Sequence, residues 1–376
     1  MKKRLLFIIW SFSYGGGAEK QLATLVNGLD SNKYDIDIIE FYHSNIDYEK
    51  INSNVHILKP INDAVNESKI KRKIINILAY IAPSIVRKMY IKNKYDYEIS
   101  FNYLIPTFLL SNNKNCKRIC VFHGPIWNLK AKKNIVLKFI QKKHLMRVDR
   151  IVAISKETYN SILSIFPTHS SKTTIINNGY DFKAMDEKSN LYKPIIKGNC
   201  INLLFCNRLD INKNPFFLIE VAKKLHDENL KFHLNILGSG ELKNDLIDCI
   251  NKYDLNSQVS LIGYVSNPYP YIKKCDIICL TSKTEGFSTF LIEGLHFKKP
   301  FISTKTSVPL DLKNFKCGYI TDDVEEYANY IKKLIDDRKQ YVYMSEKCYS
   351  ESKKYTIENQ IANYEKLLEE VFNDKS

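Results

Sequence analysis

The chain has 376 residues, of which 44% are hydrophobic and 12% aromatic, and its formal net charge is +15. This composition excludes a disordered or fibrous protein, and the length exceeds what one hydrophobic core usually supports, so we expect two globular domains. The longest internal apolar run, residues 74–86, contains Asn76 and Pro83 and is too short to cross a bilayer, so we expect no transmembrane helix.

The apolar start of the chain ends in a glycine turn without a small-residue cleavage site, which indicates a first strand rather than a signal peptide. Nine cysteines occur without a C-x-x-C pair or a zinc-binding spacing. Several of them, including Cys120, Cys206 and Cys279, stand in apolar runs typical of buried strands. We therefore expect free thiols in a reducing cytoplasm.

Strand-like and helix-like segments alternate through the first half of the chain, beginning with a strand at 4–10 and a helix at 18–30. Further strands are expected at 34–42, 97–103, 117–124, 150–155 and 172–179, with a helix at 156–166. This alternation is typical of a parallel sheet covered by helices.

Polar residues, a proline and a glycine interrupt this alternation at 181–199, and a second series of the same kind follows. Its expected strands lie at 201–209, 230–240, 259–265, 276–282 and 300–304, and an amphipathic helix at 356–374 ends the chain. We predict an α/β protein with two doubly wound Rossmann-like domains that face a cleft. The expected boundaries are 1–185 for the first domain, 186–355 for the second, and 356–376 for a C-terminal helix that packs back toward the first domain.

Open α/β sheets bind ligands at the carboxyl ends of their strands, so function is expected in the loops found there. The first such loop, SYGGGAEK (13–20), opens a helix and would let backbone amides approach an anion. It is not a dinucleotide fingerprint, because Lys20 stands where a third glycine is needed, and LGSGELKN fails the same test at Lys243. A plain strand-to-helix turn is the alternative interpretation.

Two further loops carry candidate side chains. In CNRLDINKN (206–214), Arg208 offers a planar fork and Lys213 a point charge, which suit a diphosphate, although a solvated basic loop is the alternative. In CVFHGP, His123 follows a strand and would face the cleft, although most isolated histidines are structural.

Two glutamates, Glu285 and Glu293, flank the segment GFSTFLI. This segment connects an expected strand to a helix that begins near Ser288. Glu285 would lie in the loop and Glu293 in the second helical turn. A solvated loop acid followed by an ordinary helix acid is the alternative interpretation.

The positive charge is concentrated between Ser68 and Val148, where eighteen Lys or Arg residues face only Asp96 and Glu98. Lysines there alternate with apolar residues, so a helix would either pack on a core with a solvated basic face or lie on anionic lipid. Nucleic acid is a weaker alternative, because no recognition motif accompanies the charge. The residues predicted for a membrane face are Lys71, Arg72, Lys73, Lys132 and Lys133.

Together these loops resemble the family 4 glycosyltransferases, retaining nucleotide-sugar enzymes of the two-domain GT-B fold. The ordered motifs run through nearly the whole chain: SYGGGAEK, FHGP, RIVAISKE, IINNGYD, CNRLDINKN, ILGSGELKN, VSLIGYV and EGFSTFLIEGL. The resemblance implies that Glu293 binds the ribose hydroxyls of the donor and that Glu285 lies beside the transferred sugar. It also implies that His123 lies near the hydroxyls of that sugar.

The same resemblance implies the rest of the site. Arg208 and Lys213 would stabilise the leaving diphosphate, and Asn207 stands where the family usually has glycine. The remaining residues expected to bind the donor are Gly16, Gly17, Gly263, Gly286, Phe287, Ser288 and Thr289. Asp35 and Asp37 fall inside a strand, so we interpret them as structural and expect neither a metal nor another cofactor.

The predicted function is transfer of a hexose or N-acetylhexosamine from a nucleotide sugar, UDP by family frequency, with retention and by a front-face mechanism. The acceptor would be an undecaprenyl-diphosphate-type saccharide in O-antigen, capsule or related polysaccharide synthesis. The protein would then be cytoplasmic and peripheral on the anionic inner face of the plasma membrane, without nucleic acid. Alternatives are a nucleotide-sugar 2-epimerase or hydrolase of the same fold, or a non-catalytic lipid- or nucleic-acid-binding protein.

Overall fold

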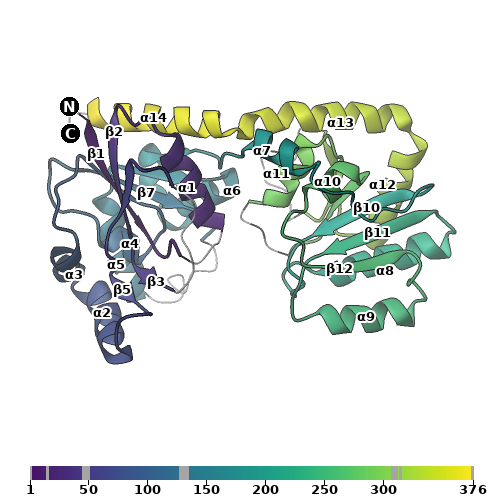
Figure 1. The fold of residues 1–376 in the computed structure, drawn as a ribbon, viewed down its shortest axis with the longest axis horizontal. Coiled ribbons are helices and arrows are strands. Elements are labelled where there is room, and N and C mark those ends of the chain that lie inside the picture. The colour runs from purple at the N-terminus through teal and green to yellow at the C-terminus, as the bar shows by residue number, and fades with distance from the viewer. Residues whose placement is uncertain are drawn as a thin grey trace. The chain divides into compact units, whose positions relative to one another are not determined.

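The computed structural model describes residues 2–13, 17–44, 51–126, 135–283, 285, 287–305, 312 and 316–373 (Figure 1). Its internal contacts divide the chain into two compact units. Unit 1 comprises Met1–Gly179 and Ile357–Ser376, and unit 2 comprises Tyr180–Thr356. Each unit has a parallel sheet with helices on it, which confirms the predicted fold class. The division lies between Gly179 and Tyr180, whereas the sequence predicts it after residue 185.

Unit 1 contains, in the described residues, a seven-stranded parallel sheet of order β4-β2-β1-β6-β7-β8-β9. Its strands are β4 (Val55–Ile57), β2 (Tyr34–Glu40), β1 (Lys3–Ile9), β6 (Tyr97–Ser100), β7 (Lys117–Phe122), β8 (Arg150–Ala153) and β9 (Thr173–Ile175). Two short strands, β3 (Tyr42–His43) and β5 (Asn62–Asp63), pair with each other beyond the end of β2. They connect the main sheet to the next helix.

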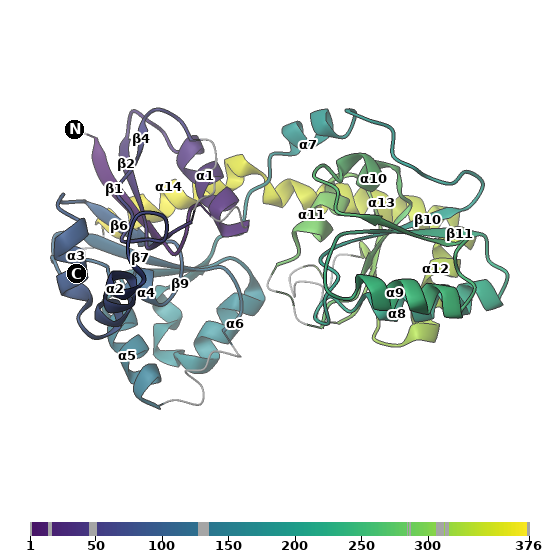
Figure 2. The same cartoon turned by 60° about the horizontal axis from the view of Figure 1, so that its bottom comes forward.

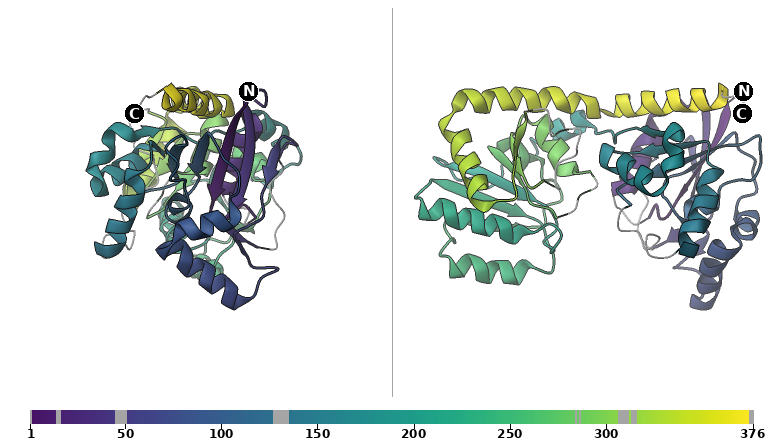
Figure 3. Two further views of the ribbon diagram at one scale, coloured as in Figure 1. Left: turned by 90° about the vertical axis from the view of Figure 1, so that its left-hand side faces the viewer. Right: turned by 180° about the vertical axis from the view of Figure 1, so that it is seen from behind.

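The helices of unit 1 pack on both faces of this sheet. They are α1 (Gly17–Gly28), α2 (Lys69–Ile81), α3 (Pro83–Tyr90), α4 (Ile105–Phe108), α5 (Ile135–Met146), α6 (Lys156–Ile165), the 3-10 helix Pro167–Lys172, and α14 (Ile357–Asn373). One core joins β1 and β2 to residues of α2 to α6, including Ile75, Phe108 and Ile162. Helix α14 lies against α1 and the sheet, where the hydroxyl of Tyr97 donates to the carbonyl of Leu368 at 3.0 Å (Figure 3).

Unit 2 contains, within the described range, a six-stranded parallel sheet of order β12-β11-β10-β13-β14-β15. The strands are β12 (Val259–Gly263), β11 (Phe232–Leu237), β10 (Ile201–Cys206), β13 (Ile277–Leu280), β14 (Phe301–Ser303) and β15 (Gly318–Ile320). The helices are α7 (Phe182–Lys188), α8 (Pro215–Asp227), α9 (Lys243–Lys252), α10 (Tyr269–Lys274), α11 (Thr289–His296), α12 (Val324–Asp336), α13 (Arg338–Ser352) and the 3-10 helix Lys353–Tyr355.

Two apolar cores bury the two faces of the unit 2 sheet. Helices α8, α9 and α12 contribute to one core, and α7, α10, α11 and α13 contribute mainly to the other. Figure 2 shows α8 and α9 together on one side of the strands and α10 on the other. Among the helices that the described residues form, none is both long and apolar enough to cross a bilayer.

Strand order also locates the place where a ligand is expected in each unit. In unit 1, β2 lies on one side of β1 and β6 lies on the other. In unit 2, β11 and β13 flank β10 in the same way. Loops that leave neighbouring strands in opposite directions open a crevice at their carboxyl ends. The carboxyl edges beside β1 and β10 are therefore the two places to search.

Candidate functional site

Backbone hydrogen bonds join the loops that follow β10, β11 and β12 at the carboxyl edge of unit 2. The amide of Asn207 donates to Leu237, that of Leu209 to Ser239, and that of Gly238 to Gly263, over 2.8 to 3.1 Å. A Cβ at Gly238 would lie 1.9 Å from the carbonyl oxygen of Asn207, and the φ of +140° also favours glycine. The glycine of LGSG therefore lets two loops touch, which explains it without a dinucleotide.

A cavity of about 290 Å³ opens at this edge. It is lined by Cys206, Asn207, Arg208, Leu237, Gly238, Ser239, Tyr264 and Val265. Its volume is close to the lower limit of ~300 Å³ for small-molecule pockets, so it is large enough for part of a ligand. Two predicted residues, Asn207 and Arg208, line it, and Gly263 adjoins it. Sequence reasoning did not single out Ser239 or Tyr264.

Glu293 lies in α11 with 9% of its surface exposed. Tyr269 forms a side-chain hydrogen bond with it, and burial together with this carboxylate raises the pKa of Tyr269 well above its usual value. Burial, followed by the charge of Glu293, also raises the pKa of the Cys206 thiol to about 12. Cys206 lines the cavity, so the charge of Glu293 acts on a residue of the cavity wall, although Glu293 is not itself among the lining residues.

Lys213 and Glu285 form an ion pair with each other. The hydroxyl of Ser282 donates to the same carboxylate oxygen at 3.1 Å, and the amide of Lys213 donates to Asp210 at 2.9 Å. The sequence analysis gave these two residues separate tasks, one at the diphosphate and one at the sugar. The structure brings them together, so an anion that binds Lys213 competes with Glu285 for it.

Arg208 is highly exposed, with 77% of its side chain accessible. Its Nε lies 3.8 Å from the carboxylate of Asp210, a long ion-pair distance. A guanidinium held this loosely is free to reorient toward an incoming diphosphate.

The segment before α11 is used partly for structure. The Oγ of Ser288 accepts the amide of Leu291 at 3.3 Å and so caps the helix, and Ser288 is 4% exposed. Phe287 packs its ring against Tyr355, at 5.6 Å between ring centroids. Thr289 begins the helix, and its hydroxyl lies 3.5 Å from that of Tyr180. Gly286 lies outside the described residues, so three of the four predicted positions are placed here.

His123 follows β7 at the carboxyl edge of unit 1. Its ring lies 4.6 Å from that of Phe101, and it donates a hydrogen bond to the Phe101 backbone. Burial lowers its pKa to about 4, so the ring is neutral near pH 7. Nε2 is buried and has no hydrogen-bond partner among the described atoms, so Nδ1 makes the bond to Phe101. The ring therefore presents an unsatisfied acceptor, which requires explanation in a folded protein.

The glycine-rich loop of unit 1 is described only in part. Gly16 lies outside the described residues, and Gly17 is the first residue of α1. A Cβ added at Gly17 would meet no described atom within 4 Å. Packing therefore does not require this glycine, which is consistent with close approach of a ligand.

The two aspartates of the D-x-D motif have partners within the sheet. Asp37 accepts a hydrogen bond from the hydroxyl of Tyr95 and lies 3.7 Å from Arg4, which is also 3.6 Å from Asp35. Among the residues described here, no group of three or more His, Cys, Asp or Glu side chains is arranged to hold a metal ion.

The predicted basic face lies on α2, whose outward side is also apolar. Ile70, Ile74, Ile77 and Ile81, spaced four, three and four residues apart, are each at least 50% exposed. We call these four residues the isoleucine stripe. Ile85 and Met89 of α3 are similarly exposed. The sequence left open whether such residues pack on a core, and these six do not.

The predicted basic residues of α2 differ in exposure. Lys71 and Lys73 are exposed, and Lys71 forms an ion pair with Glu67 at 2.6 Å. Arg72 is partly buried, since its Nε donates to Asn62 at 3.0 Å and its guanidinium lies 5.6 Å from the ring of Tyr42. Arg72 therefore anchors α2 to β5 and β3. Lys132 and Lys133 lie outside the described residues.

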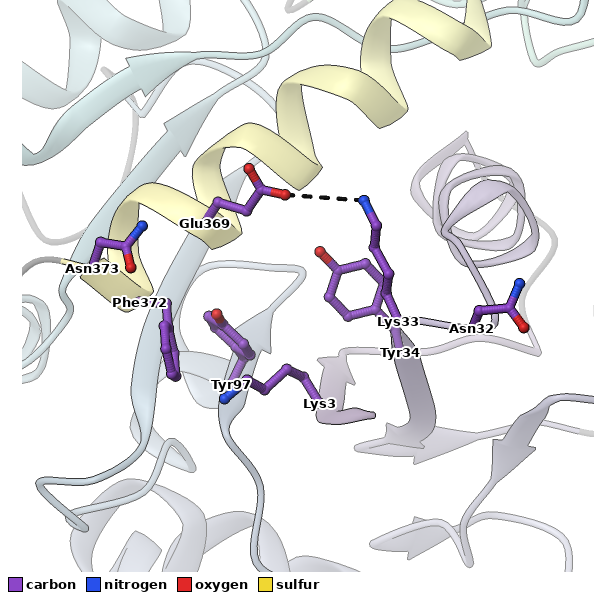
Figure 4. Close-up of a pocket in the computed structure, with 8 residues that line it drawn as sticks. All are labelled: Lys3, Asn32, Lys33, Tyr34, Tyr97, Glu369, Phe372 and Asn373. Carbon is purple, nitrogen blue, oxygen red and sulfur yellow. Dashed lines mark ion pairs between the residues drawn. The ribbon is translucent and has the colours of Figure 1, made fainter. Parts of the chain in front are cut away.

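A second cavity, of about 430 Å³, opens at the amino edge of the unit 1 sheet (Figure 4). It is lined by Lys3, Asn32, Lys33, Tyr34, Tyr97, Glu369, Phe372 and Asn373. Lys33 lies 4.0 Å from Glu369, and Lys3 lies 3.6 Å from the centre of the Phe372 ring. Because these cations already contact groups of the protein, the cavity is best explained as imperfect packing of α14 on the strands.

Comparisons with known proteins fit this geometry. Residues 15–184 match the family model described as Glycosyltransferase Family 4, and residues 189–351 match the model described as Glycosyl transferases group 1. The chain is 29% identical over 298 residues to the N-acetylgalactosamine-N,N'-diacetylbacillosaminyl-diphospho-undecaprenol 4-alpha-N-acetylgalactosaminyltransferase of Campylobacter jejuni, with 78% of each chain covered.

A second Campylobacter jejuni relative is GalNAc-alpha-(1->4)-GalNAc-alpha-(1->3)-diNAcBac-PP-undecaprenol alpha-1,4-N-acetyl-D-galactosaminyltransferase. It is 26% identical, with 80% of this chain and 79% of the relative covered. Among solved structures, Anabaena Alr3699/HepE in complex with UDP matches with a TM-score of 0.74, 15% identity, and coverage of 98% of this chain and 100% of the other. The last match concerns the fold. With both of its halves matched in order, the chain belongs to the family 4, group 1 glycosyltransferases.

Proposed function

We propose that this enzyme is a retaining transferase that moves a hexose or N-acetylhexosamine from a UDP-linked sugar to a lipid-linked oligosaccharide in O-antigen, capsule or related surface-polysaccharide synthesis. The observation that carries the proposal is the cavity at the carboxyl ends of β10, β11 and β12, which Asn207 and Arg208 line and where the charge of Glu293 acts on Cys206. A 2-epimerase, a hydrolase or a non-catalytic binding protein is not favoured, because the named relatives are transferases.

On the donor side, unit 2 would bind the nucleotide. Glu293, oriented by Tyr269, would accept hydrogen bonds from the two ribose hydroxyls, while the cavity holds the base. The amides at the start of α11 and the backbone near Gly263 would contact the diphosphate and sugar. Glu285 would lie beside the transferred sugar.

Arg208 and Lys213 would supply positive charge where the leaving diphosphate gains negative charge as the glycosidic bond breaks. Lys213 is held by Glu285 and becomes available to a diphosphate when that pair opens. With two cations and a helix amino terminus on the diphosphate, we propose that a metal ion is not required. EDTA should then leave the rate nearly unchanged, and strong inhibition reversed by Mn²⁺ or Mg²⁺ would contradict this part of the proposal.

On the acceptor side, unit 1 would contribute His123 and the glycine-rich loop. A neutral imidazole whose Nδ1 donates to Phe101 offers Nε2 as an acceptor for a sugar hydroxyl, which would satisfy the buried nitrogen. We assign His123 to binding rather than to proton abstraction. The departing phosphate oxygen would take the acceptor's proton on the same face of the sugar.

The acceptor class is supported by the relatives, both of which carry undecaprenol-linked diphosphate saccharides in their names. An enzyme with such an acceptor must reach a membrane surface. We propose that α2 and α3 lie on anionic lipid, with the isoleucine stripe at the acyl boundary and Lys71 and Lys73 at the headgroups.

Screening the purified protein against a panel of nucleotide sugars by thermal shift tests the donor proposal. UDP and one UDP-sugar should raise the melting temperature, because a ligand that binds only the folded state stabilises it. The Glu293→Gln variant should lose most of this shift. No shift with any nucleotide sugar in the panel would contradict the proposed function.

Liposome flotation tests the membrane proposal. The protein should float with phosphatidylglycerol vesicles at low salt and be released at high salt, since surface charges are screened over about 8 to 10 Å. Replacing Ile74 and Ile77 with Ser, or Lys71 and Lys73 with Glu, should each weaken flotation. Matched reversal of Lys243 and Lys252 on α9 should not. Equal flotation with neutral vesicles would contradict the electrostatic part.

A further inference from the structure

Glu40, the last residue of β2, is a buried carboxylate that the sequence analysis did not single out. It is 0% exposed, and the adjacent Ile39 and Phe41 are equally buried. Placing a carboxylate in such surroundings is costly unless hydrogen bonds replace its water. The partners of Glu40 therefore indicate what the residue does.

Most of these partners come from the loop after β1. One carboxylate oxygen, Oε2, accepts the amides of Phe12 and Ser13 at 2.8 and 3.2 Å and the hydroxyl of Ser13 at 3.1 Å. The other, Oε1, accepts a hydrogen bond from Nδ1 of His43 at 2.6 Å. Hydrogen bonds to an ionised acceptor are about twice as strong as neutral ones, so this carboxylate holds the loop and the imidazole firmly.

A second set of hydrogen bonds continues from Ser13. The amide of Ser44 donates to Oγ of Ser13 at 3.0 Å, and the hydroxyl of Ser44 donates to the Ser13 carbonyl at 3.3 Å. The chain segments that leave β1 and β2 are thus tied to each other, and Glu40 lies where they meet. Displacing this carboxylate would release both segments.

The loop held by Glu40 leads directly to the start of α1. Ser13 is four positions before Gly17, the first residue of α1. A side chain would fit at Gly17 without contacting a described atom, yet the residue there is glycine. By contrast, a Cβ at Gly28, in the last turn of the same helix, would lie 2.0 Å from Ile361. The glycine at the end of α1 is thus explained by packing, whereas Gly17 keeps space open at the carboxyl edge.

We propose that Glu40 is a positioning residue for sugar transfer. It fixes the backbone of Phe12 and Ser13 and the ring of His43, so that the start of α1 presents one geometry to the acceptor saccharide. The inference rests on the proposed function, because the glycine-rich loop, whose last glycine begins α1, is assigned to the acceptor side there. Loss of this geometry lowers turnover. It does not weaken UDP binding, because unit 2 binds UDP through Glu293.

The test compares E40Q with E98Q. Glu98 is a similarly buried carboxylate of the same sheet, bound by Arg87 at 2.6 Å and by the amide of Ser111 at 2.7 Å. Within the described residues, these hydrogen bonds go to Arg87 and Ser111 rather than to the loop after β1. Both variants lose a buried charge, so both should unfold more easily. Only E40Q should lower kcat, by about 10²-fold, since misplacement near 1 Å has that effect.

Rates are measured with UDP-N-acetylgalactosamine and an undecaprenyl-diphosphate-linked N-acetylhexosamine, and UDP affinity by calorimetry. Hydrogen exchange at Phe12 and Ser13 should rise in E40Q and not in E98Q, while UDP affinity stays within about twofold of the wild type in both. E40D, which keeps the charge, should recover part of kcat, and it also serves if E40Q does not fold.

Equal kcat losses in E40Q and E98Q, or faster exchange in E40Q with normal kcat, would show that Glu40 is merely structural. Failure of the wild type to bind any nucleotide sugar would instead contradict the proposed function. The two failures are therefore distinguishable, because normal UDP binding and transfer by E40Q would contradict only the role of Glu40.

Discussion

The carboxyl edges of the two sheets share an architecture but differ in how they hold polar groups. At the edge of unit 1, Glu40 is fully buried with its oxygens hydrogen-bonded, and His123 is kept neutral by burial. At the edge of unit 2, Arg208 is 77% exposed, and Lys213 is held by an acid from another loop.

This difference corresponds to two kinds of recognition. A buried, prearranged group costs little to align and suits neutral hydroxyls, whose position must be exact for transfer. An exposed cation such as Arg208, or a cation paired inside the protein such as Lys213, suits a diphosphate, which brings its own charge and can displace an internal partner. Variants at the two edges should therefore lose function in different ways.

The largest effect is expected at the cations of unit 2. Replacing Arg208 or Lys213 with Ala should lower turnover by about 10²-fold or more, because each stabilises charge that develops on the leaving group. UDP release measured in initial-rate assays checks this. Lys252→Ala, at an exposed lysine of α9, is the matched control. Losses confined to KM would place both cations in ground-state binding and weaken the comparison.

Glu293 should show the next largest effect, and in binding rather than turnover. Glu293→Gln removes a charge-assisted acceptor and should weaken UDP binding by roughly 1.5 to 3 kcal/mol, measured by calorimetry. The fold should survive, as circular dichroism can verify. Glu220→Gln, at an exposed acid of α8, should change nothing. Unchanged affinity in the Glu293 variant would remove this residue from the site.

The buried His123 at the edge of unit 1 should make the free energy of unfolding depend on pH in acid. The pKa of His123 is about 4 in the folded state and near 6.5 when unfolded, so the unfolded state binds more protons between these values. The free energy of unfolding should therefore fall as the pH falls from 6.5 to 4, by up to about 1.4 kcal/mol per pH unit from this group.

Urea denaturation at several pH values measures this slope. His123→Asn should reduce it, whereas His226→Asn, at a partly exposed histidine of α8, should not. His144, whose pKa burial also lowers to about 4, contributes a slope of its own that both variants retain. An unchanged slope in the His123 variant would mean that this ring is not held neutral, and the contrast between the edges would weaken.

Sequence reasoning could locate both edges, because alternating strands and helices determine where parallel strands end. It could not reveal that Lys213 contacts Glu285, since the two are separated by 72 positions and meet only through tertiary folding. The role of Glu40 could not be predicted for another reason. Within YDIDIIEFY it does not differ from the other acidic residues of an alternating strand pattern.

Helix α2 shows a related limit. Its periodicity defines an apolar face, but four of its isoleucines remain exposed while Ile75 and Ala79 are buried. Sequence alone cannot decide which of several apolar stripes meets the core, because the choice depends on the shape of the sheet beneath. The same holds for Arg72, whose bond to Asn62 turns a predicted surface charge into an anchor.

The smallest predicted effect concerns Tyr269, which the sequence analysis did not single out. Burial and the nearby charge of Glu293 raise the pKa of Tyr269 well above its usual value, so its hydroxyl keeps its proton and can donate to that carboxylate. Tyr269→Phe removes one hydrogen bond of about 0.5 to 1.5 kcal/mol and should weaken UDP binding by roughly two- to thirteenfold. In the Glu293→Gln background the same change should matter less, because residues that act through one another are not additive. A double-mutant cycle by calorimetry measures this coupling. Full additivity would mean that Tyr269 does not orient Glu293.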